Sequence, residues 1–359
     1  MTRFVRRLAR NRPALLALGV LLAIAFACCI GPAFTGHAPE RIYPDLIAVP
    51  PGLAPHPRPD TVVPALESLA FRMRATATEV AVRDGHVRFA LTAPNPIDPR
   101  ALTYLPRSDL FGPATILARE ADGRRLVVTA PVLARRFLLG TDGLGRDLLT
   151  RTLVAGRVSL LIGLVATAVA LVIGLTYGAV AGYAGGRIDA VMMRIVDGLY
   201  ALPFVFFVIM LLVFFDAGLG LILVAIGAVE WLDMARMVRA QTLSLRRRDF
   251  VRAAEALGLS AAAILRRHIV PNTLGPVAVA ATLLVPRVIL LESFLSFLGL
   301  GIQEPETSWG ALIAEGARTI ESAPWMLAVP AAFLVATLLA LNILGDALGR
   351  ALDPRNAPR

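Results

Sequence analysis

The sequence predicts an all-α polytopic membrane protein with six transmembrane helices and a small β-containing extracytoplasmic insertion after the first helix. Three observations lead to this prediction. Apolar residues make up 57% of the 359 residues, charged residues make up only 17%, and the mean hydropathy is +0.69. Several apolar runs reach the roughly 20 residues that a helix needs to cross a bilayer. Between the first two runs, the segment 36–136 carries the alternating pattern of β-strands instead.

The six apolar runs are separated by flanks whose charges alternate in sign. The expected helices cover residues 14–34, 158–183, 198–216, 218–238, 273–299 and 325–346. The N-terminus before Ala14 holds five Arg and no acidic residue, and 239–268 holds seven Arg, whereas 301–324 holds four Glu and one Arg. Because cytoplasmic flanks are enriched in basic residues, both termini are expected on the cytoplasmic side of a bacterial inner membrane.

This orientation divides the chain into four parts. They are 1–35, the cytoplasmic N-terminus with the first helix; 36–136, the extracytoplasmic insertion; 155–346, the transmembrane core, which includes a cytoplasmic connector at 246–271; and 347–359, a cytoplasmic tail. The net charge of +10 comes from Arg residues that cluster at the ends of the apolar runs. This placement sets topology, so the bilayer is the expected partner and nucleic acid is not.

A cleavable signal peptide is an alternative interpretation of the first 29 residues, which begin with Arg and continue as an apolar run. The run extends to Phe34, however, which makes it long enough to span the membrane. We therefore expect a membrane helix here.

Two stretches of the insertion are typical of β-hairpins. Alternating segments 78–83 and 86–91 flank Asp84-Gly85, and segments 115–120 and 125–130 flank Asp122-Gly123. Asp-Gly is a preferred pair for the tight turn of a hairpin. We expect a small antiparallel β subdomain, with a disordered spacer as the alternative.

The composition argues against a catalytic site in this chain. It contains no lysine, so it cannot form a phosphate-binding loop, whose Lys reaches the β- and γ-phosphates. The adjacent Cys28 and Cys29 cannot build a disulfide framework, and the four His show no metal-ligand spacing. We expect no enzyme activity, no cofactor and no metal in this chain; any ATP and Mg that drive it are used by other subunits.

The segment 249–272, DFVRAAEALGLSAAAILRRHIVPN, is a polar, Ala-rich connector between two apolar runs. One face of its expected helix carries, at helical spacing, Phe250, Ala253, Ala254 and Leu257. The small Ala residues would let a partner groove approach closely, and Phe250 would supply an apolar anchor. An amphipathic helix on the lipid headgroups is the alternative.

Three residues delimit the helices of this connector. Gly258 is expected to let the chain turn away after the first helix. Ser260 is expected to cap a second short helix. Pro271 is expected to start the next membrane helix.

Charged residues within the expected membrane helices are costly and therefore noteworthy. Arg287 and Glu292 lie five residues apart on the fifth helix and are expected to approach one another, as candidates for gating or packing; direct substrate contact by Glu292 is the alternative. Glu230 and Asp233 lie near the cytoplasmic end of the fourth helix. Before the second helix, a salt-linked turn is expected from Asp142, Arg146, Asp147 and Arg151.

Four stretches, in order along the chain, resemble the peptide-type ABC permeases. They are 137–160, similar to G-T-D-x-x-G-R-D-x-x-x-R; 249–272, similar to the cytoplasmic E-A-A-x-x-x-G motif; 285–309, similar to E-[AS]-F-L-S-F-L-G-L-G-x-Q-x-P-x-x-S-W; and 342–354, similar to N-x-x-G-D-x-L-x-x-x-L-D-P. The third favours the oligopeptide branch of the C-type permeases. One departure is that Arg252 replaces the Glu expected before Ala253, while Glu255 follows.

The resemblance implies the type I ABC importer permease core and the role of C-type membrane subunit of an oligopeptide importer that works by alternating access. It implies as partners a second homologous permease, two ATP-binding cassette ATPase subunits and an extracytoplasmic peptide-binding protein. It also implies that the connector docks in a cleft of the ATPase. The residues expected to couple the two are Phe250, Arg252, Ala253, Ala254, Glu255, Leu257, Gly258 and Pro271.

Two other functions are compatible with the sequence. One is a secondary transporter or channel that needs no ATPase, a class that often carries acidic residues within the membrane. The other is an ABC importer of nickel, glutathione or short sugars, which relatives carry.

Overall fold

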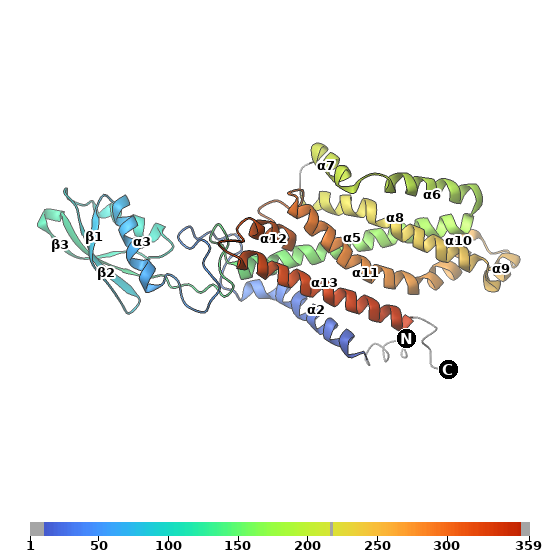
Figure 1. The fold of residues 1–359 in the computed structure, drawn as a ribbon, viewed down its shortest axis with the longest axis horizontal. Helices are drawn as coiled ribbons and strands as arrows, with labels where there is room; N and C mark the ends of the chain where they lie inside the picture. The colour runs from blue at the N-terminus through green and yellow to red at the C-terminus, as the bar shows by residue number, and fades with distance from the viewer. Residues whose placement is uncertain (1–10, 216–217, 353–359) are drawn as a thin grey trace. The chain divides into compact units, whose positions relative to one another are not determined.

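The computed structural model describes residues 11–215 and 218–352, which form two compact units (Figure 1). The helical unit comprises the chain up to residue 34, residues 152–318 and the chain from 330 onward, and the mixed unit comprises 35–151 and 319–329. Some features singled out in the sequence lie outside the described residues: the Arg residues within 1–10, residue 216 at the end of an expected helix, and 353–359 with the close of the fourth family-like stretch.

The helical unit consists of long helices joined by shorter elements. In chain order the described elements are α2 (Arg12–Ile30), η1 (Gly31–Ala33), α5 (Leu148–Ala184), α6 (Gly186–Tyr200), α7 (Phe204–Phe214), α8 (Leu219–Arg246), α9 (Asp249–Ala256), α10 (Ala261–Ile264), the π-helical η4 (Leu265–Ile269), α11 (Val270–Phe297), α12 (Trp309–Ala317) and α13 (Trp325–Leu352). The central helix α11 packs against α8 and α12, and both α6 and α7 pack against α8.

Four of the described helical segments are long and apolar enough to cross a membrane: 12–33, 148–184, 261–297 and 325–351. The α6–α7 pair raises the number to five if it forms one broken span. Helix α8 is 28 residues long but carries four charged residues at intervals of three, Glu230, Asp233, Arg236 and Arg239, and ends on a fifth, Arg246. The structure therefore agrees with a helical membrane protein without reproducing the expected count of six.

The single helix expected at 198–216 is wrong. The structure places the end of α6 and the start of α7 there, with a bend of 80° between them. Pro203 explains the break, because it lacks an N–H and disfavours helical backbone at the preceding Leu202. The residues before the break, expected as a connector, form α6 itself.

Ion pairs fasten α6 to α8. Arg239 donates two hydrogen bonds, of 2.5 and 2.6 Å, to the carboxylate of Asp189. Arg236 forms an ion pair with Asp197 at 2.8 Å. Both Arg residues lie on one face of α8, three residues apart. The polar side of α6 is thereby directed at α8.

A row of glycines allows α5 to approach α8 closely. Gly174, Gly178 and Gly182 recur every fourth residue on one face of α5. A Cβ atom added at Gly174 would lie 2.6 Å from the Cβ of Met234, and one at Gly182 would lie 2.8 Å from the carbonyl oxygen of Arg239. This spacing of small residues is typical of helix pairs in membranes, where close backbone packing drives association.

The mixed unit contains a four-stranded antiparallel sheet. Its strands are β1 (Thr76–Arg83), β2 (His86–Thr92), β3 (Thr115–Glu120) and β4 (Arg125–Pro131), in the order β1-β2-β4-β3. Both expected hairpins are confirmed. Asp84 and Gly85 have φ angles of 49° and 73°, as the tight turn between β1 and β2 requires.

A helix not expected from the sequence, α3 (Pro59–Arg72), packs against the sheet. Its apolar face, which includes Val62, Leu66 and Leu69, joins Phe89 and Val128 of the sheet in one buried core. Pro59 at the first position of the helix suits its N-terminus. The remaining described elements of this unit are short: η2 (Pro99–Thr103), α4 (Tyr104–Arg107) and η3 (Ala121–Gly123).

The salt-linked turn before α5 is present. The carboxylate of Asp142 accepts hydrogen bonds from the backbone N–H groups of Leu144 and Arg146 at 2.9 and 2.8 Å, and from the side chains of Arg146 and Arg151. Asp147 instead accepts from Thr150 at the start of α5. These buried hydrogen bonds stabilise the turn and occupy the acceptor positions of the Asp142 carboxylate, so they leave none free to bind a ligand.

Candidate functional site

The connector between α8 and α11 is two short helices joined by a glycine turn, at one end of the helical unit (Figure 1). After α9, the N–H of Gly258 donates to the carbonyl of Glu255 at 2.9 Å, and the N–H of Leu259 donates to that of Ala254 at 3.2 Å. Gly258 has a φ of 78°. This is a Schellman motif, which requires left-handed backbone at the glycine. The expected role of Gly258 as the end of the helix is confirmed.

The second half of the connector leads directly into α11. The Ser260 hydroxyl accepts a hydrogen bond from the N–H of Ala263 at 3.3 Å and caps α10, as expected. Pro271 lies in the first turn of α11, but it stands inside a helical run that begins earlier, at Ala261. Between them, η4 keeps the chain helical, so a displacement of the connector is passed to α11 without a flexible loop.

One face of α9 is buried against the chain's own residues. Val251 and Ala254 pack with Ile264 and Ile269 in a small apolar core, which Tyr183 and Leu245 border. Ala254 is only 5% exposed. The expectation that Ala254 lies against a partner is therefore wrong: residues three apart on a helix share a face, and the face of Val251 and Ala254 anchors α9 to its own chain.

A neighbouring face of the connector is exposed. We call Phe250, Ala253 and Leu257 the docking face, because they recur at helical spacing and all are exposed. Phe250 is 42% exposed and Leu257 79% exposed. The connector that carries this patch is rich in exposed basic side chains: Arg247, Arg248, Arg252, Arg266 and Arg267 are all exposed, as are the acidic Asp249 and Glu255. The docking face is thus an apolar patch on a connector with an excess of positive charge.

Glu255, expected among the coupling residues, makes a contact within the chain. Its carboxylate accepts a hydrogen bond of 3.1 Å from the hydroxyl of Tyr183, near the end of α5. The connector is thereby held to α5 by a polar contact in addition to its apolar core.

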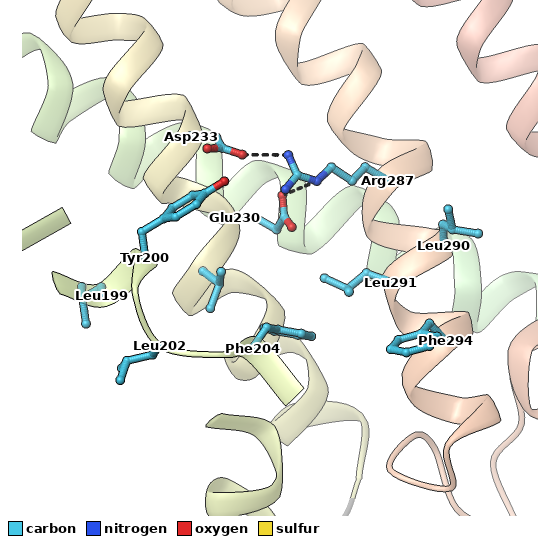
Figure 2. A pocket seen from close by; sticks show the side chains of 11 residues that line it. Leu199, Tyr200, Leu202, Phe204, Glu230, Asp233, Arg287, Leu290, Leu291 and Phe294 are labelled. Carbon is cyan, nitrogen blue, oxygen red and sulfur yellow. Dashed lines mark hydrogen bonds and ion pairs between the residues drawn. The ribbon is translucent and has the colours of Figure 1, made fainter. Parts of the chain in front are cut away.

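A second candidate region lies among α6, α7, α8 and α11. Arg287 of α11 donates a hydrogen bond to Asp233 of α8 at 2.7 Å and forms a 3.6 Å ion pair with Glu230. Figure 2 shows the three charged groups converging, with the Tyr200 ring beside them. They line a cavity of about 640 Å3 whose remaining wall is mostly apolar, with Leu199, Leu202, Phe204, Leu291 and Phe294 among its residues. A volume of this size is typical of small-molecule sites.

The expected approach of Arg287 to Glu292 is wrong. Residues five apart on a helix lie about 140° apart around its axis, and Arg287 turns toward α8 instead. Glu292 is fully buried and accepts a hydrogen bond from Ser296 at 2.7 Å. Ser296 in turn lies 3.4 Å from Ser308, which caps α12. Glu292 thus takes part in the packing of α11 on α12, one of the two roles considered for it.

Reasoning from the sequence missed two contributors to these regions. Val251 anchors the connector, and its spacing of three residues from Ala254 was an available signal. Tyr183 is 72 residues from Glu255 in the sequence, so no local sequence pattern could predict their contact.

Within 11–215 and 218–352, no group of three or more His, Cys, Asp or Glu side chains could hold a metal ion.

Comparison with known proteins assigns the sequence of this chain to a family. Residues 174–358 match the family described as "binding-protein-dependent transport system inner membrane component", and residues 1–59 match the "N-terminal TM domain of oligopeptide transport permease C". A solved chain of the MetNI methionine ABC transporter is 18% identical, with a TM-score of 0.47 over 57% of this chain and 96% of that chain. That likeness is too weak to assign a fold.

Several curated relatives are more similar. The chain is 58% identical over 172 residues to the oligopeptide transport system permease protein OppC of Escherichia coli K12, and 48% identical over 176 residues to the dipeptide transport system permease protein DppC of Bacillus subtilis. These matches cover 48% and 49% of this chain, and the chain spans a little over half of the relatives, 57% and 55% of their lengths. With the family match extending over residues 174–358, the chain belongs to the binding-protein-dependent transport system inner membrane component family.

Proposed function

We propose that this chain is a membrane-spanning permease subunit of an ATP-driven oligopeptide importer. Its family and its likeness to permeases named for oligopeptides and dipeptides support this proposal. The observation that carries it is the connector, where an exposed apolar face is presented on a short helix fixed to the chain's own long helices. An exposed patch with this anatomy marks a protein interaction site.

The proposed partner of the docking face is one of two ATPase subunits, which use the ATP and Mg. Phe250 and Leu257 would insert into an apolar cleft of an ATPase, and the exposed Arg residues of the connector favour an acidic rim on that cleft. A second homologous permease would complete the translocation path, and an extracytoplasmic binding protein would deliver the peptide.

Coupling follows from how the connector is attached. The apolar core of Val251 and Ala254 and the hydrogen bond from Tyr183 hold α9 to its own chain, and η4 joins it to α11 without a break in the helix. A push on the docking face would therefore move α9 and the start of α11 together. Transmission of this kind needs a rigid element with two arrangements, and alternating access would supply them.

Reconstitution tests the proposal against a secondary transporter. The chain would be co-purified in mild detergent with the second permease and ATPases, placed in vesicles with the binding protein, and assayed with a labelled tripeptide. We expect uptake that requires ATP and persists when ionophores remove the ion gradients. Uptake driven by an ion gradient without ATP would support a secondary transporter, and uptake of nickel, glutathione or short sugars in place of peptide would correct the substrate.

We also propose six membrane crossings, with α6–α7 as one broken crossing and α8 as another, and with the sheet outside the cell membrane and both termini in the cytoplasm. Reporter fusions at Arg248 and Asn95 test this arrangement. The fusion at Arg248 should report cytoplasm and the fusion at Asn95 the outside. A signal from outside at Arg248 would remove the docking face from the reach of ATPases.

A further inference from the structure

The cavity among α6, α7, α8 and α11 contains an unusual charge arrangement. Two carboxylates, Glu230 and Asp233, face one guanidinium, that of Arg287. With all three groups ionised, the cluster carries one uncompensated negative charge. The same three residues also border a second cavity of about 340 Å3. The cluster therefore lies at the boundary of two hollows in the helical unit.

The two carboxylates are not equally satisfied. Asp233 holds the short hydrogen bond from Arg287, at 2.7 Å. Glu230 has only the ion pair to Arg287, at 3.6 Å, which is beyond hydrogen-bond distance. Its Oε2 atom has no hydrogen-bond partner among the described residues. The acceptor that remains open in this cavity is thus on Glu230.

Burial makes that open acceptor significant. The side chain of Glu230 is 3% exposed, whereas that of Arg287 is 55% exposed. A buried carboxylate without hydrogen bonds is unfavourable because it has lost water and gained little in return. A ligand with a positively charged donor would restore the missing hydrogen bond and neutralise the excess charge.

We propose that Glu230 binds the primary ammonium group of a peptide in this cavity. The proposal deepens the proposed function and rests on it. Ammonium is the chemistry that the site favours, since it brings one positive charge and up to three donors to an open acceptor. Asp233 accepts the short hydrogen bond from Arg287, so Glu230 keeps only the longer ion pair to the same guanidinium.

The apolar wall supplies the rest of the site. Leu199 and Leu202 precede the α7 helix, Phe204 begins it, and Leu291 and Phe294 come from α11. Figure 2 shows these side chains to one side of the charged cluster. A peptide that places its ammonium on Glu230 would have its adjacent apolar side chain in contact with this wall.

Calorimetric binding to the full-length chain in lipid nanodiscs tests the proposal. Four probes separate the sources of charge: Leu-Leu-Leu-amide with an α-ammonium, N-acetyl-Leu-Lys-Leu-amide with a side-chain ammonium, neutral N-acetyl-Leu-Leu-Leu-amide, and anionic N-acetyl-Leu-Leu-Leu. We expect at least one ammonium probe to bind about tenfold or more tightly than the neutral one, as expected for a charge-assisted hydrogen bond. The stronger of the two identifies the source.

The variant Glu230→Gln should abolish this preference while it leaves binding of the neutral probe unchanged. Glu67→Gln, which removes an exposed carboxylate in the mixed unit, is the matched control and should behave as wild type. Equal binding of neutral and ammonium probes to the wild-type chain overturns the proposal, whether or not Glu230→Gln can be purified. Tightest binding of the anionic probe also overturns it and assigns the site to Arg287.

The outcome is separable from that of the proposed function. If the complex imports peptide with ATP but the wild-type chain shows no ammonium preference, this inference fails and the importer stands. If ammonium probes bind at Glu230 but ATP drives no uptake, the importer fails and the binding site stands.

Discussion

The hydroxyl of Tyr183 donates a hydrogen bond to the carboxylate of Glu255 across 3.1 Å and joins the end of α5 to the connector. The contact explains the use of an acidic residue that follows the Ala pair of the connector. In the E-A-A-x-x-x-G motif of the family, the acidic residue stands directly before that Ala pair, where this chain has Arg252. At position 255 the acid serves the chain's own packing.

Tyr183→Phe should loosen the connector without unfolding it, because the ring keeps its place beside the apolar core. Loss of one hydrogen bond is worth about 1 kcal/mol, so amide hydrogen exchange across 249–258 should be about fivefold faster. Tyr177→Phe is the control. It removes the 2.9 Å hydrogen bond that Tyr177, elsewhere on α5, donates to the carbonyl oxygen of Met192 on α6. Unchanged exchange in Tyr183→Phe would show that the apolar core alone holds α9.

Two neighbouring alanines should respond differently to the same substitution. Ala254→Glu places a charge in the apolar core of the connector, which should cost more than about 2 kcal/mol and lower the amount of protein in the membrane. Ala253→Glu changes an exposed residue of the docking face and should leave abundance and thermal stability near wild type. Membrane abundance and thermal unfolding in detergent measure both. Equal abundance of the two variants would contradict the assigned burial.

Gly258 should tolerate Asn but not Val. A Cβ atom at this position meets no other atom within 4 Å, so only the φ of 78° limits substitution. Left-handed backbone costs an L-residue about 1–2 kcal/mol, less for Asn and more for a β-branched side chain. We expect Gly258→Val to weaken ATPase binding in co-purification while Gly258→Asn retains it. Equal binding by both variants would show that the turn has no part in docking.

Local sequence signals predicted the parts of this structure that local interactions determine. The Asp84-Gly85 turn, the Ser260 cap and the Gly258 helix end each depend on contacts within a few residues. The alternation of apolar residues likewise placed both hairpins of the sheet.

The features that local sequence patterns could not predict depend on contacts between residues far apart in the sequence. Arg287 meets Asp233 across 54 residues. Its spacing from Glu292 already argues against that partner, but no local pattern identifies Asp233. Ala254 and Phe250 lie at similar helical positions, and only the packing of Tyr183 and Leu245 determines that Ala254 is the buried one. Pro203 was a local signal for a helix break. The apolar residues on both sides of it nevertheless suggested one continuous helix, so the boundary between α6 and α7 was not predicted.

The central claim is that the docking face couples ATP hydrolysis to transport, and Leu257 tests it most directly. Leu257 is more exposed than Phe250, 79% against 42%, so Leu257→Glu should leave the fold intact and place a charge where an apolar contact with the ATPase is needed. In the reconstituted complex, peptide uptake and ATPase binding should both fall at least about tenfold, the loss expected for a buried apolar anchor. Leu117→Glu, at an exposed position on β3, controls for the added charge and should transport as wild type. Normal ATP-driven uptake by Leu257→Glu, at wild-type abundance, would contradict the account.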